Sequence, residues 1–182
     1  MPDNKYIYPV KRQGNEKKPK LIILLANPGD SVDHYKRFPE YVMDKDGFYK
    51  DSGMHLDSYR VYCKWWDTVL SITDSVGISA KDVLALEFYP YHTAESSDIP
   101  KQDTWDKYAK TALQENLALF NKHIKNKVPV FVYYKVKWKE NIENEFGKEL
   151  LQTNQDIIGY SSSRWQNVIL KDLKKFLVNV SK

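Results

Sequence analysis

The sequence predicts one α/β domain with three layers: a doubly wound, mainly parallel sheet of four strands with helices on both faces. Two observations predict this fold. Four short apolar runs of strand length alternate with longer stretches of helical periodicity along the 182 residues. The chain is also the size of one domain, with 42% hydrophobic and 29% charged residues. Strands that alternate with helices form βαβ units, and right-handed crossovers place the helices on both faces of the sheet.

The four predicted strands are residues 20–26 (KLIILLA), 83–89 (VLALEFY), 128–136 (VPVFVYYKV) and 156–160 (DIIGY). The first and third are runs of apolar residues, which are typical of strands covered on both faces. Helices are predicted at residues 56–73, 104–125, 138–151 and 168–178. Each has apolar residues at helical spacing, which in the first helix are Leu56, Tyr59, Cys63, Trp66, Val69 and Leu70.

A polar, basic arm is predicted at residues 1–19, ahead of a single domain at residues 20–182. Residues 1–20 contain six basic and two acidic side chains, so the whole net charge of +4 lies there. Such a segment either contacts phosphates or is a solvated tail, and the sequence leaves both interpretations open.

We expect a cytoplasmic protein that does not associate with membranes. Cys63 is the one cysteine, so no disulfide forms within the chain. The N-terminal residues lack the apolar segment of a signal peptide, and the longest apolar run, residues 21–26, is too short to span a bilayer. The oligomeric state stays open.

Polar, small and aromatic residues follow every predicted strand. Because ligands of such sheets bind beyond the carboxyl ends of the strands, these four exits together predict the site. The candidates are Asn27, Pro28, Gly29, Asp30 and Ser31 after the first strand; Tyr89, Tyr91 and His92 at the second; Lys135, Lys137 and Lys139 at the third; and Ser162, Ser163 and Arg164 after the fourth.

Each candidate has a structural and a functional interpretation. Asn27-Pro28-Gly29 is a turn sequence, but its amide can also hold a water or read a base edge. Asp30 suits either a helix N-cap or a general base. His92 is either a hydrogen-bonded loop residue or a catalyst, while Tyr89 and Tyr91 are aromatic platforms on which a base can stack.

Lys135, Lys137 and Lys139 alternate with Val136 and Trp138. They form either an exposed, charged strand end or a set of phosphate contacts with an interleaved aromatic ring. The sequence contains no phosphate-binding glycine loop, no nucleophile-elbow motif and no cluster of metal-ligand spacing, so we expect neither a cofactor nor a metal.

The strand exits resemble those of the uracil-DNA glycosylase superfamily. The first motif, Asn27-Pro28-Gly29 after an apolar strand, is most similar to the mismatch-specific thymine/uracil branch. The resemblance implies a doubly wound sheet of four parallel strands and a role for Asn27 in positioning the attacking water. The second family motif, His-Pro-Ser, is absent, and the corresponding region is residues 161–164. Ser162 or Ser163 could replace its serine, and His92 could supply an imidazole from another strand.

The resemblance implies DNA repair by hydrolysis of the N-glycosidic bond of a flipped base. Tyr89 or Tyr91 would stack on the base, Asn27 with Asp30 would orient the water, and His92 or Arg164 would stabilise the departing base. Two alternatives stay open. One is a non-catalytic module that binds a nucleic acid or nucleotide, and the other is a small-molecule nucleoside or sugar hydrolase.

Overall fold

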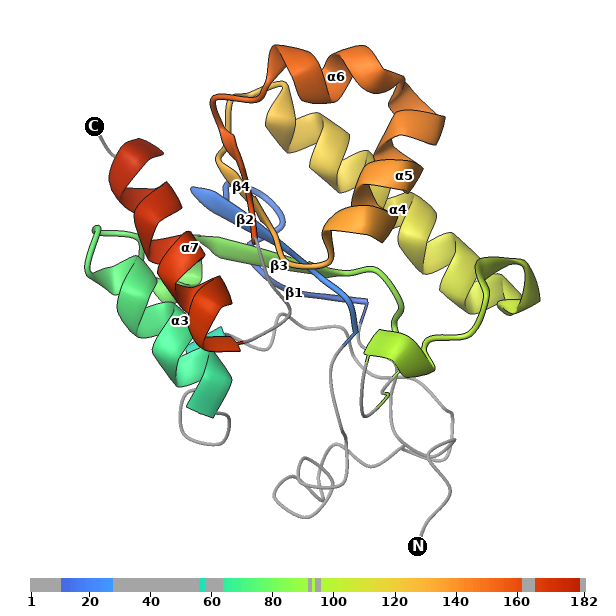
Figure 1. Ribbon diagram of the computed structural model, residues 1–182, viewed down its shortest axis with the longest axis horizontal. Coiled ribbons are helices and arrows are strands. Elements are labelled where there is room, and N and C mark those ends of the chain that lie inside the picture. The colour runs from blue at the N-terminus through green and yellow to red at the C-terminus, as the bar shows by residue number, and fades with distance from the viewer. Residues whose placement is uncertain are drawn as a thin grey trace, which may run out of the picture.

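The computed structural model describes residues 11–27, 56–57, 64–91, 93, 96–161 and 166–180 (Figure 1). It confirms the α/β class, with a mixed sheet of five strands in the order β1-β3-β2-β4-β5. The strands are β1 Arg12–Gly14, β2 Leu21–Leu25, β3 Val83–Glu87, β4 Val130–Val132 and β5 Ile158–Tyr160. The last four pair with their neighbours in parallel, and β1 pairs antiparallel to β3.

The prediction of four strands omitted β1, so the sheet begins before the predicted boundary at residue 20. Contacts with helix α4 (Lys107–Ile124) hold β1 in place. The Nδ2 atom of Asn116 on α4 donates hydrogen bonds to the carbonyl oxygens of Lys11 and Glu87, at 2.7 and 2.9 Å. Glu115 pairs with Lys11 and Arg12 at 3.0 and 2.8 Å. Residues 11–14 therefore belong to the folded domain.

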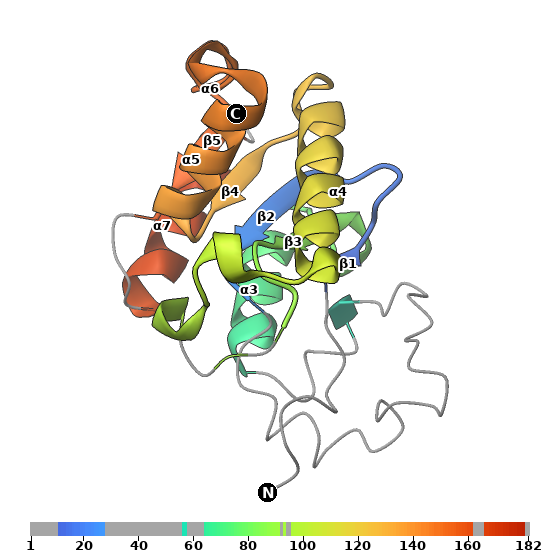
Figure 2. The ribbon, with the colours of Figure 1, turned by 90° about the vertical axis from the view of Figure 1, so that its right-hand side faces the viewer.

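Helices cover both faces of the sheet (Figures 1 and 2). Helices α3 (Lys64–Asp74) and α7 (Gln166–Val180) lie on one face. The other face carries α4 together with α5 (Lys135–Phe146) and α6 (Lys148–Thr153). Short 3₁₀ helices lie at Ala80–Asp82, Ser96–Asp98 and Gln102–Thr104. None of the helices in the described part of the chain is long and apolar enough to cross a membrane.

The helix predicted at residues 138–151 was wrong in its start and in its continuity. Helix α5 begins at Lys135, because β4 ends at Val132 and the chain turns directly into the helix. It stops at Gly147, whose φ of +83° is a left-handed conformation, and α6 follows. Of the helix predicted at residues 56–73, the part from Lys64 on is present in α3, whereas Tyr59 and Cys63 lie outside the described residues.

Side-chain alternation along the strands builds two apolar cores. In β2, Ile22 and Leu24 pack toward α4 and α5, while Leu21, Ile23 and Leu25 pack toward α3 and α7. In β3, Val83 and Ala85 share the second core, so alternation places Glu87 on the α3/α7 side as well. Burial on both faces explains why β2 is apolar at every position.

Candidate functional site

The carboxyl ends of β2 and β4 meet at the position where such sheets bind ligands. The two strands are neighbours in the sheet. The described helix that follows β2, α3, packs on one face, and α5, which follows β4, packs on the other. Neighbouring strands that lead to opposite faces leave a crevice beyond their carboxyl ends. Asn27 follows β2 and Tyr133 follows β4, so both residues lie at this crevice.

The Asn27 amide is held in a fixed orientation. Its Nδ2 atom donates a hydrogen bond to the carbonyl oxygen of Thr93, in the segment after β3, at 3.0 Å. This bond connects the segment after β2 with the segment after β3, and it fixes which side of the amide carries the nitrogen atom. None of the described residues donates to Asn27 Oδ1, and the side chain is half-buried. The oxygen can therefore accept a hydrogen bond from a water or a ligand.

Glu87, the last residue of β3, is a buried carboxyl in an apolar setting. Its side chain is 2% exposed, and its Oε2 atom has no hydrogen-bond partner. Burial raises the pKa of Glu87 well above its usual value, with no opposing contribution from a nearby cation. The side chain is therefore held toward its neutral, protonated form, in which it can donate a proton as well as accept a hydrogen bond.

Glu87, Leu25 and Tyr133 form one row across three neighbouring strands. Leu25 pairs in register with Glu87, and the hydrogen bond from Tyr133 N to Leu24 O, 2.8 Å long, continues the β2–β4 ladder by one residue. Leu25 and Tyr133 both belong to the core on the α3/α7 side. Tyr133 also lies close enough to Glu87 for the two groups to interact. Burial raises the pKa of Tyr133, and the Glu87 charge raises it further.

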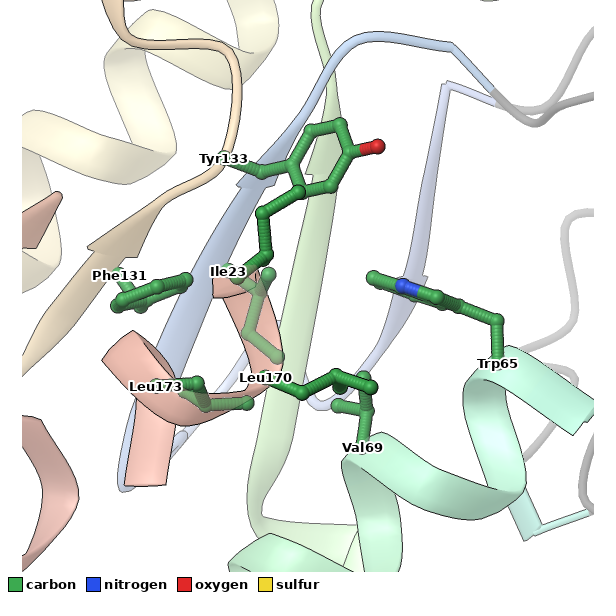
Figure 3. Close-up of a pocket in the computed structure, with 8 residues that line it drawn as sticks. Ile23, Trp65, Val69, Phe131, Tyr133, Leu170 and Leu173 are labelled. Atoms are coloured by element: carbon green, nitrogen blue, oxygen red, sulfur yellow. The ribbon is translucent and has the colours of Figure 1, made fainter. Parts of the chain in front are cut away.

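A small apolar pocket, to which Tyr133 of this row contributes, lies between α3, α7 and the sheet (Figure 3). Trp65 on α3 and Tyr133 stand at its edge, with ring centroids 6.0 Å apart and ring planes at 84°. The Tyr133 hydroxyl points away from the apolar floor in Figure 3. The remaining lining residues are Ile23, Val69, Phe131, Ile169, Leu170 and Leu173.

Tyr89 and Tyr91, the predicted stacking residues, belong to an aromatic cluster on the other side of the sheet. Their ring centroids are 5.3 Å apart, and Tyr89 also packs on Trp105 at 4.9 Å. The Tyr91 hydroxyl donates to the carboxylate of Asp106, the N-cap residue of α4. Burial and this hydrogen bond raise the pKa of Tyr91. Both rings are only half-buried.

The lysines predicted to contact phosphate lie on the first turns of α5, not on an exposed strand end. Lys137 pairs with Glu140 at 3.0 Å, and Lys139 pairs with Glu143 at 3.7 Å. Lys135 Nζ lies 4.9 Å from the centroid of the Tyr160 ring, at the end of β5.

Trp138 is not interleaved with these lysines on the surface. Its side chain is 0% exposed, and its Nε1 atom donates to the Leu25 carbonyl oxygen at 2.7 Å. Helical periodicity turns Trp138 inward while its lysine neighbours face solvent. Trp138 therefore anchors α5 to the carboxyl end of β2, next to the crevice.

The structure brings Asn27 to the predicted strand-end edge, and it adds residues that the sequence did not single out. Most of the other candidates lie outside the described residues: Pro28, Gly29, Asp30, Ser31, His92, Ser162, Ser163 and Arg164. Glu87, Tyr133 and Trp65 were missed. The signal for Glu87 was available, because it is the one charged residue within the apolar run 83–89.

The described residues contain no group of three histidine, cysteine or acidic side chains that could hold a metal ion. Comparisons with known proteins found no matching family model, no matching curated sequence and no matching solved structure.

Proposed function

We propose that the chain is a divergent relative of the uracil-DNA glycosylases, which binds a base in the crevice beyond β2 and β4 and hydrolyses its N-glycosidic bond. The observation that carries the proposal is the Asn27 amide. It follows an apolar central strand, and its Nδ2 atom donates to Thr93 O at 3.0 Å. None of the described residues donates to its Oδ1 atom, which in this proposal orients a water. Such an orientation is what water-mediated hydrolysis requires of a side chain that does not itself react.

The arrangement of the strands supports the proposal. The strands β3, β2, β4 and β5 pair in parallel with helices on both faces, which is compatible with the sheet that the resemblance implies. Trp65 and Tyr133 supply aromatic surface at the crevice, and aromatic rings bind bases without strong sequence preference. Asp30 and His92 would act beside Asn27 in this proposal, with Ser162, Ser163 and Arg164 at the exit of β5.

A second candidate is a hydrolase of free nucleosides, and the charge distribution favours it. A long nucleic acid needs unpaired cations along its path. Among the described residues, however, Lys11 and Arg12 pair with Glu115, and Lys137 and Lys139 pair with acids on their own helix. A free nucleoside carries no phosphate and needs none of these cations.

A strand-cleavage assay tests the first candidate. Labelled oligonucleotides that carry uracil, G·U, G·T or hypoxanthine are incubated with the full chain and then treated with alkali, which breaks the strand at a base-free site. We expect cleavage of at least one substrate, and a rate at least ~10²-fold lower for Asn27→Ala, the usual effect of removing a positioned catalytic group.

The matched control is Asn126→Ala. This exposed amide donates to Lys122 O in the turn after α4, where the chain approaches the amino end of β4. Its removal should leave the rate unchanged. Cleavage that survives in Asn27→Ala would refute the role of the amide. Base release from free deoxynucleosides, without cleavage of oligonucleotides, would favour the second candidate.

A further inference from the structure

Glu87 is a buried carboxyl with one oxygen that has no hydrogen-bond partner. It ends an otherwise apolar strand, is 2% exposed, and has an oxygen, Oε2, without a hydrogen-bond partner. An uncompensated polar group lowers stability, and an apolar side chain of similar volume would remove the cost. Such a group in a native protein calls for an explanation, and a catalytic role is one of them.

The position of Glu87 places it at the candidate site rather than in a remote part of the core. It pairs with Leu25, two residues before Asn27, at the carboxyl edge of the sheet. Tyr133 and Trp65, which line the apolar pocket, lie on the same side of the sheet. A flat base in contact with these two rings would lie on the face of the sheet that carries the Glu87 carboxyl.

None of the described residues of α3 and α7 places a charged group in the core on this side of the sheet. The inward residues of α3 are apolar except for Thr73, and those of α7 are apolar. Asn116, from α4, contacts only the Glu87 backbone carbonyl. Tyr133 is the one described titratable side chain whose pKa responds to the Glu87 charge. Among the described side chains, no acid or base on this side of the sheet therefore shares the Glu87 proton.

We propose that Glu87 is the proton donor to the departing base, and that the substrates are therefore purine N-glycosides. The inference rests on the proposed function and names its substrate class. A pyrimidine such as uracil can leave as a stabilised anion without being protonated. A purine leaves more readily once a ring nitrogen carries a proton, so a protonated carboxyl is useful to a purine glycosidase.

The proposed reaction balances with water as the only co-reactant. As the bond between the sugar C1′ and the purine N9 breaks, its electron pair goes to the purine, which takes the Glu87 proton on a ring nitrogen. The oxygen of a water oriented by Asn27 bonds to C1′. One proton of that water then restores the Glu87 carboxyl. The products are the free purine and a base-free sugar.

The test compares wild type, Glu87→Gln, Asn27→Ala and the exposed control Glu145→Gln in single-turnover assays. The substrates are oligonucleotides that carry hypoxanthine or uracil, and the assays run from about pH 5 to pH 9, the interval that brackets a raised carboxyl pKa. We expect wild type to release hypoxanthine, with a rate constant that falls at high pH as the donor loses its proton. Glu87→Gln should be at least ~10²-fold slower and should lack that alkaline fall. Glu145→Gln should behave like wild type.

A second readout separates a catalytic carboxyl from a structural one. Gln has the shape of Glu, and Glu87→Met removes the buried polar group altogether. If function alone retains the carboxyl, both variants should melt at or above the wild-type temperature. An increase of ~2–4 °C is the size expected when a modest destabilising contribution is removed from a domain of this size. Lower melting temperatures in both variants would show that the carboxyl is structural and overturn the inference.

The kinetic outcomes separate the inference from the function on which it rests. If Glu87→Gln releases hypoxanthine at the wild-type rate, Glu87 is not the donor. If Asn27→Ala has at the same time lost the release of hypoxanthine, the proposed function still holds. Release of uracil but not hypoxanthine would preserve the function and overturn the purine class. No release of either base would overturn both.

Discussion

At the scale of single residues, the candidate site depends on two side chains that a buried strand end does not ordinarily carry. The amide nitrogen of Asn27 donates a hydrogen bond to Thr93 O, and none of the described residues donates to its amide oxygen. Glu87 is buried without a partner for Oε2. The position of Asn27 at the sheet edge could be predicted, because Asn27-Pro28-Gly29 directly follows an apolar run and such a sequence is typical of the end of a strand. The position of Glu87 as the one charged residue of an apolar run was also visible, but the missing partner of Oε2 was not, because the partners of a carboxyl depend on which segments pack around it.

The stability of the protein should depend on pH through Glu87. Its pKa is well above the unfolded-state value of 4.5, so the native state binds more protons than the unfolded state at intermediate pH. Wild-type stability should therefore fall as pH rises above 4.5, toward the native pKa of Glu87, by at most about 1.4 kcal/mol per pH unit. In Glu87→Gln this contribution is absent.

Denaturant unfolding of wild type and Glu87→Gln over a pH series checks this prediction. The difference in unfolding free energy should grow in favour of the Gln variant with rising pH. A difference that is constant with pH would mean that the native pKa of Glu87 is ordinary.

At the scale of elements, strand β1 and the break between α5 and α6 both depend on glycine backbone conformations. Gly14, at the end of β1, has φ +92°, and an added Cβ would lie 2.2 Å from the carbonyl oxygen of Val83. Gly77 has φ +78° but no atom within 4 Å of such a Cβ. Substitution of Gly77 by alanine therefore measures the destabilisation from the left-handed conformation alone, whereas substitution of Gly14 adds the destabilisation from the close contact.

Gly14→Ala should lower the free energy of unfolding by more than about 3 kcal/mol, because the left-handed conformation and a backbone clash act together. Gly77→Ala, the matched control, should cost only about 1–2 kcal/mol for the conformation. Urea unfolding of both variants measures the difference. Equal costs would mean that β1 shifts to accommodate the methyl group, and that its pairing with β3 is loose.

The elements also explain which boundaries the sequence could predict. The strands at residues 20–26 and 83–89 were placed well, because runs of buried apolar residues are long enough there to be distinctive. The strand β1 sequence, Arg12-Gln13-Gly14, is polar, and it joins the sheet through long-range contacts with Glu115 and Asn116. No local pattern reports such contacts. The end of β4 at Val132 could not be predicted either. Tyr133 and Tyr134 continue its apolar run in the sequence, although they lie in the bend that leads to α5.

At the scale of the whole molecule, the net charge of +4 is less available to a partner than the sequence implied. Of the five cations at residues 11–20, Lys11, Arg12 and Lys20 pair with carboxylates on Glu115, Glu16 or Asp82. Lys17 and Lys18 are exposed and form no ion pair with the described residues. A phosphate backbone would have to compete with these intramolecular pairs, which leaves Lys17 and Lys18 as the accessible cations of this segment.

Nucleic-acid binding should consequently depend only weakly on salt. A plot of the logarithm of the binding constant against the logarithm of salt concentration should have a slope shallower than about −3, which corresponds to roughly three phosphate contacts. Fluorescence anisotropy with a labelled oligonucleotide measures this slope. A slope steeper than about −6 would mean that the intramolecular ion pairs open on binding and that a long phosphate path crosses the surface.

The central claim is that the carboxyl edge between β2 and β4 is the ligand site, and NMR titration of the full chain tests it most directly. Deoxyuridine and deoxyinosine are added in turn while the backbone amide, Asn side-chain and Trp indole signals are followed. We predict that the largest shifts belong to the Asn27 side-chain amide, the backbone amide of Tyr133 and the indole of Trp65. Shifts confined to the opposite edge, around Gly77 and Lys127, or no shifts with either nucleoside, would contradict the claim.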